Sequence, residues 1–494
     1  MWIEAAENQE LSAVCLLDQS AAYDLLCHQT LKKKLSLYNF SSSATDWLMS
    51  YLGDRTQIVV VESKSSDPLH GGDHAVPQGS VLGGLLHLIN SNDFPACHDV
   101  GESVVYVDDD SDTVHSKDPE ELINLIEQEA GNSAKWLNDN RLCVSADKSK
   151  LLIVGTKQLR ASKITSEAKI VIGDKEVTET ASEKLLGVVI NNELTWKNHL
   201  YGDMKNEGLI TQLSKRIGMM KKISKYMSQE NLKYFASGIF YSKLNYCLPV
   251  FGNVFGLENY KEDNSRYQSF TTKDNKNLQV LQNKLNRMLL NAEYNTPTEK
   301  LLEDTASLSI QQMIAYHSAV LAFKILSSGK PEYLANKLTK RTEGMELRGR
   351  SGSIQTSKKS LSISKEAFLH RGACLMNKLD NNLRNESKLE KFKTGMKKWS
   401  KENIKTKPTS KYPKITFRNP VQAHPTPQLE ANPNDIRQFL VPLAPPPPTD
   451  RPPPPTRPQP TDRPLTTATQ SVNRITRYFT PAQGTGTRSG SNGN

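Results

Sequence analysis

Cysteine is scarce in this chain of 494 residues, which holds six. They are Cys15, Cys27, Cys97, Cys143, Cys247 and Cys374. None forms a C-x-x-C pair or stands at zinc spacing from a histidine, so a structural zinc site is excluded. A secretory signal peptide is also absent, and no apolar run approaches the roughly 20 residues that cross a bilayer. We therefore expect a reduced, soluble, intracellular protein that does not bind a membrane.

Hydrophobic residues are few, at 37% of the chain, and acidic residues are outnumbered by basic ones. Lys and Arg total 63 against 53 Asp and Glu, which gives a formal net charge of +10. The low hydrophobic fraction indicates that part of the chain does not pack into a core. The basic balance favours a polyanionic partner, with a solvated basic surface as the alternative.

Proline is rare before Lys407 and abundant after it, with 7 and 19 of the 26 prolines respectively. The block APPPPTDRPPPPTRPQPTDRP repeats a Pro-run, Thr, Arg unit and predicts extended polyproline II. Such a segment cannot bury enough apolar surface to offset its ordering entropy. We expect residues 407–494 to form a disordered tail.

Residues 1–200 read as mixed α/β, because short apolar runs alternate with helical patterns. The predicted strands are Leu11–Asp18, Gln57–Ser63, Ser103–Val107 and Lys150–Thr156. Asp118 is placed to cap a helix whose first turn accepts Pro119. Its apolar stripe comprises Leu122, Ile126, Ala130, Ala134 and Leu137. From about Leu209 onward the pattern is helical, and the run Asn277–Leu290 places one leucine stripe on its buried side.

Val104–Asp112, VVYVDDDSD, gathers four acids at the end of a predicted strand. Carboxylates this close repel each other and raise one another's pKa, so a cation is expected beside them. The alternation of aspartates matches the opening of an EF-hand loop, but that loop needs glycine and glutamate where Thr113 and Pro119 stand. A solvated acidic turn and a two-metal site remain as readings.

The two-metal reading places Asp108 and Asp109 in the turn of a β-hairpin, where their oxygens can coordinate Mg²⁺. Two such ions stabilise the attacking and leaving oxygens in phosphoryl transfer. A further carboxylate is needed, and Asp18 also ends a buried strand. Adjacent strands would bring these ends together.

Five segments occur in an order that resembles the successive palm motifs of reverse transcriptases from non-LTR retrotransposons. They are LLDQSAAYD (16–24), VPQGSVLGGLL (76–86), YVDD (106–109), DKSKLLIVGT (147–156) and LLGVVINNELTWKNHL (185–200). The resemblance continues through SGIFYSKLNYCLPVFGNV (237–254) to HRGACLMNKLDNNLR (370–384) and ends before the proline-rich tail.

The resemblance implies an α/β right-hand polymerase fold. Its palm, an antiparallel sheet with packed helices and remnant fingers, would occupy residues 1–200. A thumb-like helical region would span 201–270, a helical C-terminal region 271–406 and the disordered tail 407–494. The implied activity is RNA-directed DNA polymerisation in the nucleus, with an RNA template, a DNA primer and deoxynucleoside triphosphates as partners.

In the resembling motifs, Asp18 and Asp108 would be the principal ligands of two Mg²⁺ ions, for which Mn²⁺ can substitute, and Asp109 would complete the acidic set. Asp110 has no assigned role and reads as a turn residue.

Tyr23 matches the aromatic residue beneath the sugar that selects deoxynucleotides; a packed core tyrosine is the alternative. Gln78 and Gly79 match the segment that approaches the nucleotide or template, or else form a helix-start turn. Lys148 matches a lysine near the leaving pyrophosphate; one more surface lysine is the alternative, since Lys150 lies two residues away.

Basic residues on the helix from Leu209 would hold the phosphate backbone of a primer–template duplex. They are Lys215, Arg216, Lys221, Lys222 and Lys225. An ordinary packed helix with a solvated basic face is the alternative.

The chain departs from the motifs at Gly84, where proline is usual, at His87, where an aromatic residue is usual, and in INSND (89–93). It has no fingers segment upstream, no endonuclease and no ribonuclease H pattern, so we expect a truncated element. The rival hypothesis is a catalytically inactive nucleic-acid-binding remnant.

The tail carries one further motif, VNRITRYF (472–479). Ile475, Tyr478 and Phe479 resemble the box by which replication proteins bind the sliding clamp, although Val472 replaces the usual glutamine. Incidental apolar residues in a disordered tail are the alternative.

Overall fold

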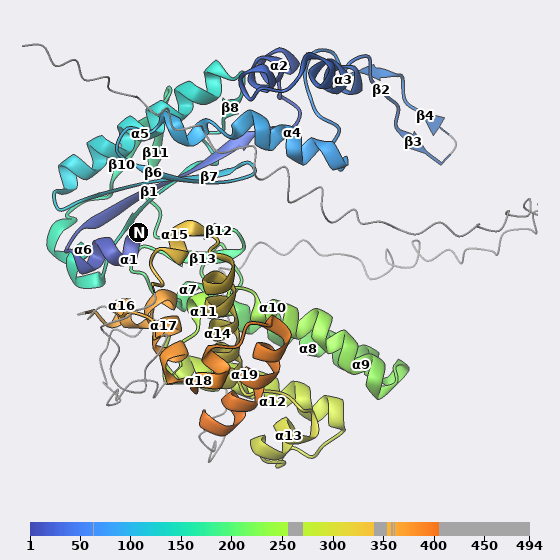
Figure 1. The fold of residues 1–494 in the computed structure, drawn as a ribbon, viewed down its shortest axis with the longest axis vertical. Helices are drawn as coiled ribbons and strands as arrows, with labels where there is room; N and C mark the ends of the chain where they lie inside the picture. The colour runs from blue at the N-terminus through green and yellow to red at the C-terminus, as the bar shows by residue number, and fades with distance from the viewer. Residues whose placement is uncertain (63, 255–269, 340–352, 357–358, 360, 405–494) are drawn as a thin grey trace, which may run out of the picture. The chain divides into compact units, whose positions relative to one another are not determined.

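The computed structural model describes residues 1–404 except 63, 255–269, 340–352, 357–358 and 360 (Figure 1). These residues belong to one compact unit, Met1–Ser410. The predicted tail and its clamp motif lie outside the described residues.

A five-stranded antiparallel sheet forms the centre of the first half (Figure 1). Its order is β6 (Glu102–Tyr106), β7 (Asp109–Ser116), β1 (Leu11–Ser20) and β8 (Cys143–Val144), and β9 (Lys150–Val154) also pairs with β1. Three of the predicted strands, β1, β6 and β9, are thereby confirmed.

Alternate residues of β1 face two different cores, as the two-residue period of a strand requires. Leu11, Ala13, Cys15 and Leu17 face helix α5 (Pro119–Asp139), where Leu122 and Ile126 complete the cluster. Val14 and Leu16 face the other way, where Trp2 of α1 (Trp2–Glu7) packs. The sheet is therefore covered on both faces along most of β1.

Helix α5 begins where the sequence predicts. The side chain of Asp118 accepts a hydrogen bond from the backbone N–H of Glu120 at 3.2 Å, and Pro119 occupies the first turn. Leu122, Ile126 and Ala130 are fully buried. The cap and the apolar stripe thus fix both the start and the rotation of this helix.

The predicted strand Gln57–Ser63 is wrong. The chain there forms two narrow ribbons, β2 (Thr56–Gln57) with β5 (Leu69–His70) and β3 (Val60–Val61) with β4 (Lys64–Ser65). Val60 and Val61 are 64% and 66% exposed. An apolar run predicts burial only where a second layer covers it, and two-stranded ribbons have none here.

Three helices build a separate core beside the sheet. They are α2 (His28–Leu37), α3 (Ser42–Leu52) and α4 (Val81–Ser91), followed by the short η1 (Phe94–Cys97). Leu31, Leu35, Leu48 and Leu86 are buried among them.

The rest of the first half consists of α6 (Lys157–Lys163), α7 (Lys197–Tyr201) and two hairpins. These are β10 (Lys169–Ile172) with β11 (Lys175–Thr178), and β12 (Ser182–Leu185) with β13 (Val188–Asn191). The two-residue turn of the second hairpin has positive φ at Leu186 and Gly187, the turn geometry that matches strand twist. The Tyr246 hydroxyl donates to the Leu186 carbonyl at 2.6 Å and so anchors this turn.

The second half is helical. Its elements are α8 (Leu209–Ile223), η2 (Ser224–Tyr226), α9 (Gln229–Ala236), η3 (Ser237–Tyr241), α10 (Ser242–Asn245), α11 (Leu248–Phe251), α12 (Thr272–Leu290), α13 (Thr298–Asp304), α14 (Ile310–Ser328), α15 (Glu332–Ala335), α16 (Ser362–Glu366), α17 (Phe368–Lys378), α18 (Asn381–Arg384) and α19 (Leu389–Asn403). One hydrophobic cluster runs from Leu200 to Ile404 and draws on most of them. The stripe of α12 is confirmed, since Leu278, Leu281 and Leu285 are buried in this cluster.

No described helix combines the length and apolar character that a bilayer crossing needs. All six cysteines lie among the described residues, where none forms a disulfide, and Cys15 and Cys27 are buried.

His199 of α7 makes the stability of this fold sensitive to acid. Its ring packs on Phe251 with centroids 4.9 Å apart, and its Nδ1 accepts from the Val189 N–H at 3.4 Å. Burial, with a smaller contribution from the charge of Lys243, lowers its pKa to about 4.

Because the folded protein holds His199 neutral, its contribution to stability is present above the unfolded pKa of about 6.5 and is lost as the pH falls towards 4. The loss is at most about 3 kcal/mol. His199→Asn, whose Oδ1 can replace the Nδ1 acceptor, should show a shallower decline in urea unfolding between pH 6.5 and 4. Equal slopes for wild type and variant would contradict this assignment.

Candidate active site

Antiparallel pairing places two of the predicted carboxylates opposite one another. In the register of β1 with β7, Asp18 is the direct partner of Asp109. Side chains of directly opposed residues project from the same face of a sheet. Asp109 also faces Tyr106 across the β6–β7 pair. The strand ends thus meet as the two-metal reading predicts.

The turn between β6 and β7 holds Val107 and Asp108, and Asp109 is the first residue of β7. Val107 has φ of +64°, a left-handed conformation that β-branched residues rarely adopt. Strained backbone of this kind persists only where its surroundings enforce it. Here the paired ends of β6 and β7 do so, and they leave Asp108 exposed at the tip.

The charges at this tip are incompletely balanced. Desolvation, followed by the negative charges of Asp108 and Asp18, raises the pKa of Asp109. One cation is already present, because Lys148 Nζ lies 3.4 Å from Asp18 Oδ1. Both groups are substantially exposed, so their attraction in the free protein is weak. Lys148 is thus an exposed lysine beside Asp18, and its predicted role near the leaving pyrophosphate stays a prediction.

The side chains do not themselves form a finished cage. Across the part of the chain that the structure describes, no three His, Cys, Asp or Glu side chains are arranged to hold a metal ion. The backbone register brings Asp18 and Asp109 together, while convergence of all three carboxylates stays a prediction.

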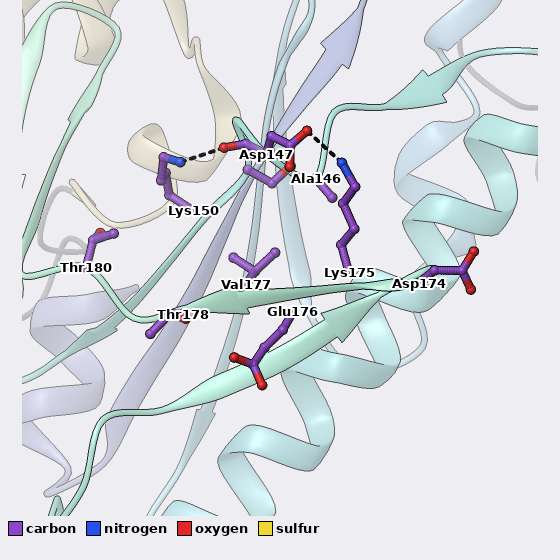
Figure 2. Close-up of a pocket in the computed structure, with 10 residues that line it drawn as sticks. Ala146, Asp147, Lys150, Asp174, Lys175, Glu176, Val177, Thr178 and Thr180 are labelled. Atoms are coloured by element: carbon purple, nitrogen blue, oxygen red, sulfur yellow. Dashed lines mark hydrogen bonds and ion pairs between the residues drawn. The ribbon is translucent and has the colours of Figure 1, made fainter.

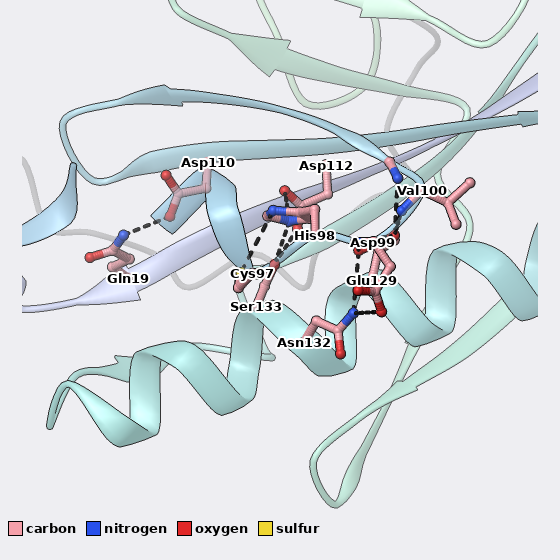
Figure 3. Close-up of polar contacts among 11 residues, drawn as sticks. Gln19, Cys97, His98, Asp99, Val100, Asp110, Asp112, Glu129, Asn132 and Ser133 are labelled. Atoms are coloured by element: carbon pink, nitrogen blue, oxygen red, sulfur yellow. Dashed lines mark hydrogen bonds and ion pairs between the residues drawn. The ribbon is translucent and has the colours of Figure 1, made fainter. Parts of the chain in front are cut away.

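The other two acids of VVYVDDDSD point into the protein. Asp110 is opposite Leu17 and Asp112 is opposite Cys15, so both lie on the α5 face of the sheet. Asp110 is 1% exposed and accepts a hydrogen bond from Gln19 Nε2 at 2.6 Å (Figure 3). Burial, and less so the neighbouring acids, raises its pKa to about 7. The interpretation of Asp110 as a turn residue is therefore wrong.

Asp112 is fully buried and paired (Figure 3). Its Oδ1 lies 2.9 Å from His98 Nε2, and its Oδ2 accepts from the Ser133 hydroxyl of α5 at 2.6 Å. Burial opposes protonation of His98, but the hydrogen bond and charge of Asp112 outweigh it and raise the pKa of the imidazole. The contacts of Asp112 with His98 and Ser133 tie β7 to α5 and to the segment after η1.

Glu129 of α5 fixes that same segment. Its carboxylate accepts from the backbone N–H groups of Asp99, Val100 and Gly101, the last two at 2.7 and 2.9 Å (Figure 3). Burial raises the pKa of Glu129, but these hydrogen bonds outweigh burial, so the pKa is lowered overall. The strand β6, which leads to the acidic turn, is thus held at its start.

Sequence reasoning missed the roles of Asp112, His98, Ser133 and Gln19. The sequence does carry one signal for the two acids. Because alternate residues of a strand point to opposite faces, Asp110 and Asp112 cannot share the face of Asp109. The histidine and serine carry no such signal, because their meeting depends on how α5 lies on the sheet.

The predicted nucleotide-binding residues gather around the turn after β1. The Tyr23 carbonyl accepts from the Val76 N–H at 2.9 Å, and Gln78 Nε2 donates to Asp24 at 3.0 Å. Gln78 and Gly79 precede α4, which Ser80 caps by accepting from the Gly83 N–H.

The requirement for glycine at 79 comes from its backbone. Its φ is +76°, whereas a Cβ there would meet nothing within 4 Å. The structure therefore supports a special turn at Gly79 rather than close packing at that point.

The predicted nucleic-acid-binding residues lie on α8 and η2 but differ in their surroundings. Lys215 is ion-paired with Glu207 at 2.5 Å, and the guanidinium of half-buried Arg216 donates to the Ile239 carbonyl. Lys221 and Lys222 are exposed. Lys225 is exposed too and lies over the Tyr226 ring at 4.9 Å. Their binding of nucleic acid stays a prediction.

An open cavity of about 600 Å³ lies between the β8–β9 connection and the β10–β11 hairpin (Figure 2). Lys175 and Lys150 both bind Asp147 there, the former at 2.6 Å to the carboxylate and the latter at 3.0 Å to the carbonyl. None of the predicted site residues lines it. The cavity is therefore separate from the acidic turn.

Removing the buried acid beneath the turn should destabilise the fold strongly. Asp112→Ala removes the carboxylate that contacts both His98 and Ser133 and leaves these two side chains only their mutual contact at 2.9 Å. Breaking a buried pair costs about 3–5 kcal/mol. Urea unfolding measures the loss. Asp139→Ala is the control on α5, since it removes an exposed acid whose partner, Lys135, is also exposed. Similar losses in both variants would show that the buried network contributes nothing special.

Comparison with known proteins supports the resemblance to reverse transcriptases of non-LTR retrotransposons. No family model matches the chain. It is 27% identical over 203 residues to the probable RNA-directed DNA polymerase from transposon X-element of Drosophila melanogaster, a match that covers 40% of this chain and 21% of that protein. It is 25% identical over 207 residues to the RNA-directed DNA polymerase from mobile element jockey of the same organism, covering 40% and 22%.

Solved structures with partial likeness include telomerases of Candida tropicalis. A complex with a TWJ fragment of telomeric RNA aligns at 14% identity over 67% of this chain and 50% of that chain, with a TM-score of 0.30. An apo form truncated from the C-terminal domain aligns at 15% identity over 37% and 35%, with a TM-score of 0.27. The chain thus matches about a fifth of the length of its curated relatives, and its similarity to reverse transcriptases of non-LTR retrotransposons is confirmed.

Proposed function

We propose that this chain is an RNA-directed DNA polymerase of the non-LTR retrotransposon type, which copies RNA into DNA. The observation that carries the proposal is the register of β1 with β7, which sets Asp18 opposite Asp109 beside the exposed turn residue Asp108. Similarity to two polymerases of mobile elements supports the same activity.

We expect the acidic turn to bind divalent cations. Asp18, Asp108 and Asp109 would hold two Mg²⁺ ions, or Mn²⁺ in their place, since these hard ions prefer carboxylate oxygen. The raised pKa of Asp109 supports the fit, because desolvation and the charges of Asp108 and Asp18 disfavour its ionisation and a cation would restore it. Bound ions supply charge stabilisation at the attacking and leaving oxygens of phosphoryl transfer.

The residues of the chain would perform the remaining tasks. Lys148, which lies beside Asp18, would move to the triphosphate. There it would donate a proton to the leaving pyrophosphate or offset its negative charge. Tyr23 would exclude nucleotides that carry a 2′-hydroxyl. Exposed Lys221, Lys222 and Lys225 would contact the phosphates of the RNA template and DNA primer.

Primer extension on poly(rA) with an oligo(dT) primer, dTTP and Mg²⁺ tests the activity. We expect incorporation by wild type and a loss of about a thousandfold in Asp108→Asn, Asp109→Asn, because charge stabilisation by metals is worth several kcal/mol. Both asparagines keep the size of the side chains, so the fold should be retained. If wild type incorporates no more than the double variant, the chain is instead an inactive nucleic-acid-binding remnant, and a gel shift with the same duplex would detect its binding.

A comparison of Lys148 with the nearby Lys150 distinguishes a specific role of Lys148 from the effect of general surface charge. Lys148 lies 3.4 Å from Asp18, whereas Lys150 donates to the Asp147 carbonyl. Lys148→Ala should lower the single-turnover rate of incorporation by about 10²-fold, as expected for loss of a general acid. Lys150→Ala should leave that rate unchanged. Equal effects would contradict a specific role for Lys148.

A further inference from the structure

Tyr23 and His87 form a stacked pair. Their ring centroids lie 4.8 Å apart and their planes differ by 20°. Tyr23 comes from the turn after β1, while His87 lies 64 residues later on α4. The contact therefore joins the segment that follows Asp18 to the helix that follows Gln78 and Gly79.

Each ring is fixed differently. His87 is 3% exposed, and α4 is anchored around it by buried Leu86 and Ile89. Tyr23 is only partly buried at the edge of the same core, and the contacts described for its side chain are packing contacts. The imidazole is thus a buried flat surface on which the partly exposed phenol ring stacks.

His87 is an unusual choice for such a surface. Its Nε2 is buried and has no hydrogen-bond partner among the described residues. A buried polar atom without a partner is unfavourable for stability, and a phenylalanine ring would present a similar flat face without it. Burial lowers the pKa of His87, against a smaller opposing effect of Asp108.

We propose that His87 is a positioning residue for nucleotide selection: by stacking, it fixes the Tyr23 ring in the orientation that excludes a ribose 2′-hydroxyl. The ligand class is the incoming nucleoside triphosphate, and the inference rests on the proposed polymerase function. His87 is buried, so it acts through Tyr23 and does not touch the nucleotide itself. If the Tyr23 ring were free to rotate, it would leave space for the 2′-hydroxyl, and the protein would bind ribonucleotides and deoxyribonucleotides with similar affinity.

Equilibrium binding tests this without requiring turnover. Wild type is assembled with a poly(rU) template and an oligo(dA) primer that ends in a dideoxynucleotide, and the Kd values of dATP and ATP are measured with Mg²⁺. Their ratio is the readout, since a general loss of packing would weaken both nucleotides equally. Tyr23→Ala serves as the reference, because it gives the ratio of the ATP and dATP Kd values when the tyrosine ring is absent.

Two substitutions at 87 separate stacking from simple filling of the core. His87→Leu fills a similar volume without a flat ring and should reduce the dATP preference about tenfold, towards that of Tyr23→Ala. His87→Phe keeps the flat ring, so it should retain the preference and should not lower the unfolding temperature. If His87→Leu does not fold, unbranched His87→Met gives the same comparison.

The outcomes are distinguishable. A preference that falls in Tyr23→Ala but not in His87→Leu overturns the role of His87 and leaves the proposed function intact. An equal fall in His87→Phe and His87→Leu also overturns it, because the flat ring would then be irrelevant. If wild type binds neither nucleotide on the primed template, the inference and the proposed function fail together.

Discussion

The pairing of β7 with β1 is the constraint on which the rest of the candidate site depends. Because a strand turns alternate residues to opposite faces, one register decides the environment of every acid in VVYVDDDSD. Asp109 shares a face with Asp18, whereas Asp110 and Asp112 are directed towards α5. A single geometric rule thus divides one run of like charges into an outer group and an inner group.

The negative charges of the two groups are balanced in different ways. The inner acids are compensated by the protein, Asp112 by His98 and Ser133 and Asp110 by a hydrogen bond from Gln19 and a raised pKa. The outer acids face solvent with Lys148 as a weak counter-charge. Inner compensation holds β7 against α5, and outer negative charge remains available for cations.

Much of the local structure could be predicted from sequence. The strands Leu11–Asp18 and Ser103–Val107, the capped start of α5 and the leucine stripe of α12 follow from short-range periodicity and cap chemistry, and the structure confirms them. The run Gln57–Ser63 was predicted as a strand and instead forms exposed ribbons, since no local pattern reveals whether a second layer covers a segment. For the same reason the partners of Asp112 and the stacking of His87 on Tyr23 depend on packing between distant elements.

The left-handed turn residue Val107 has a consequence for how firmly Asp108 is placed. Valine on its own favours extended backbone, so nothing local holds the chain in this bend. The bend exists only while Tyr106 and Asp109 stay paired on either side of it. The position of Asp108 therefore depends on this last strand pair. If Tyr106 and Asp109 separated, the turn would relax and the Asp108 carboxylate would move away from Asp18 and Asp109.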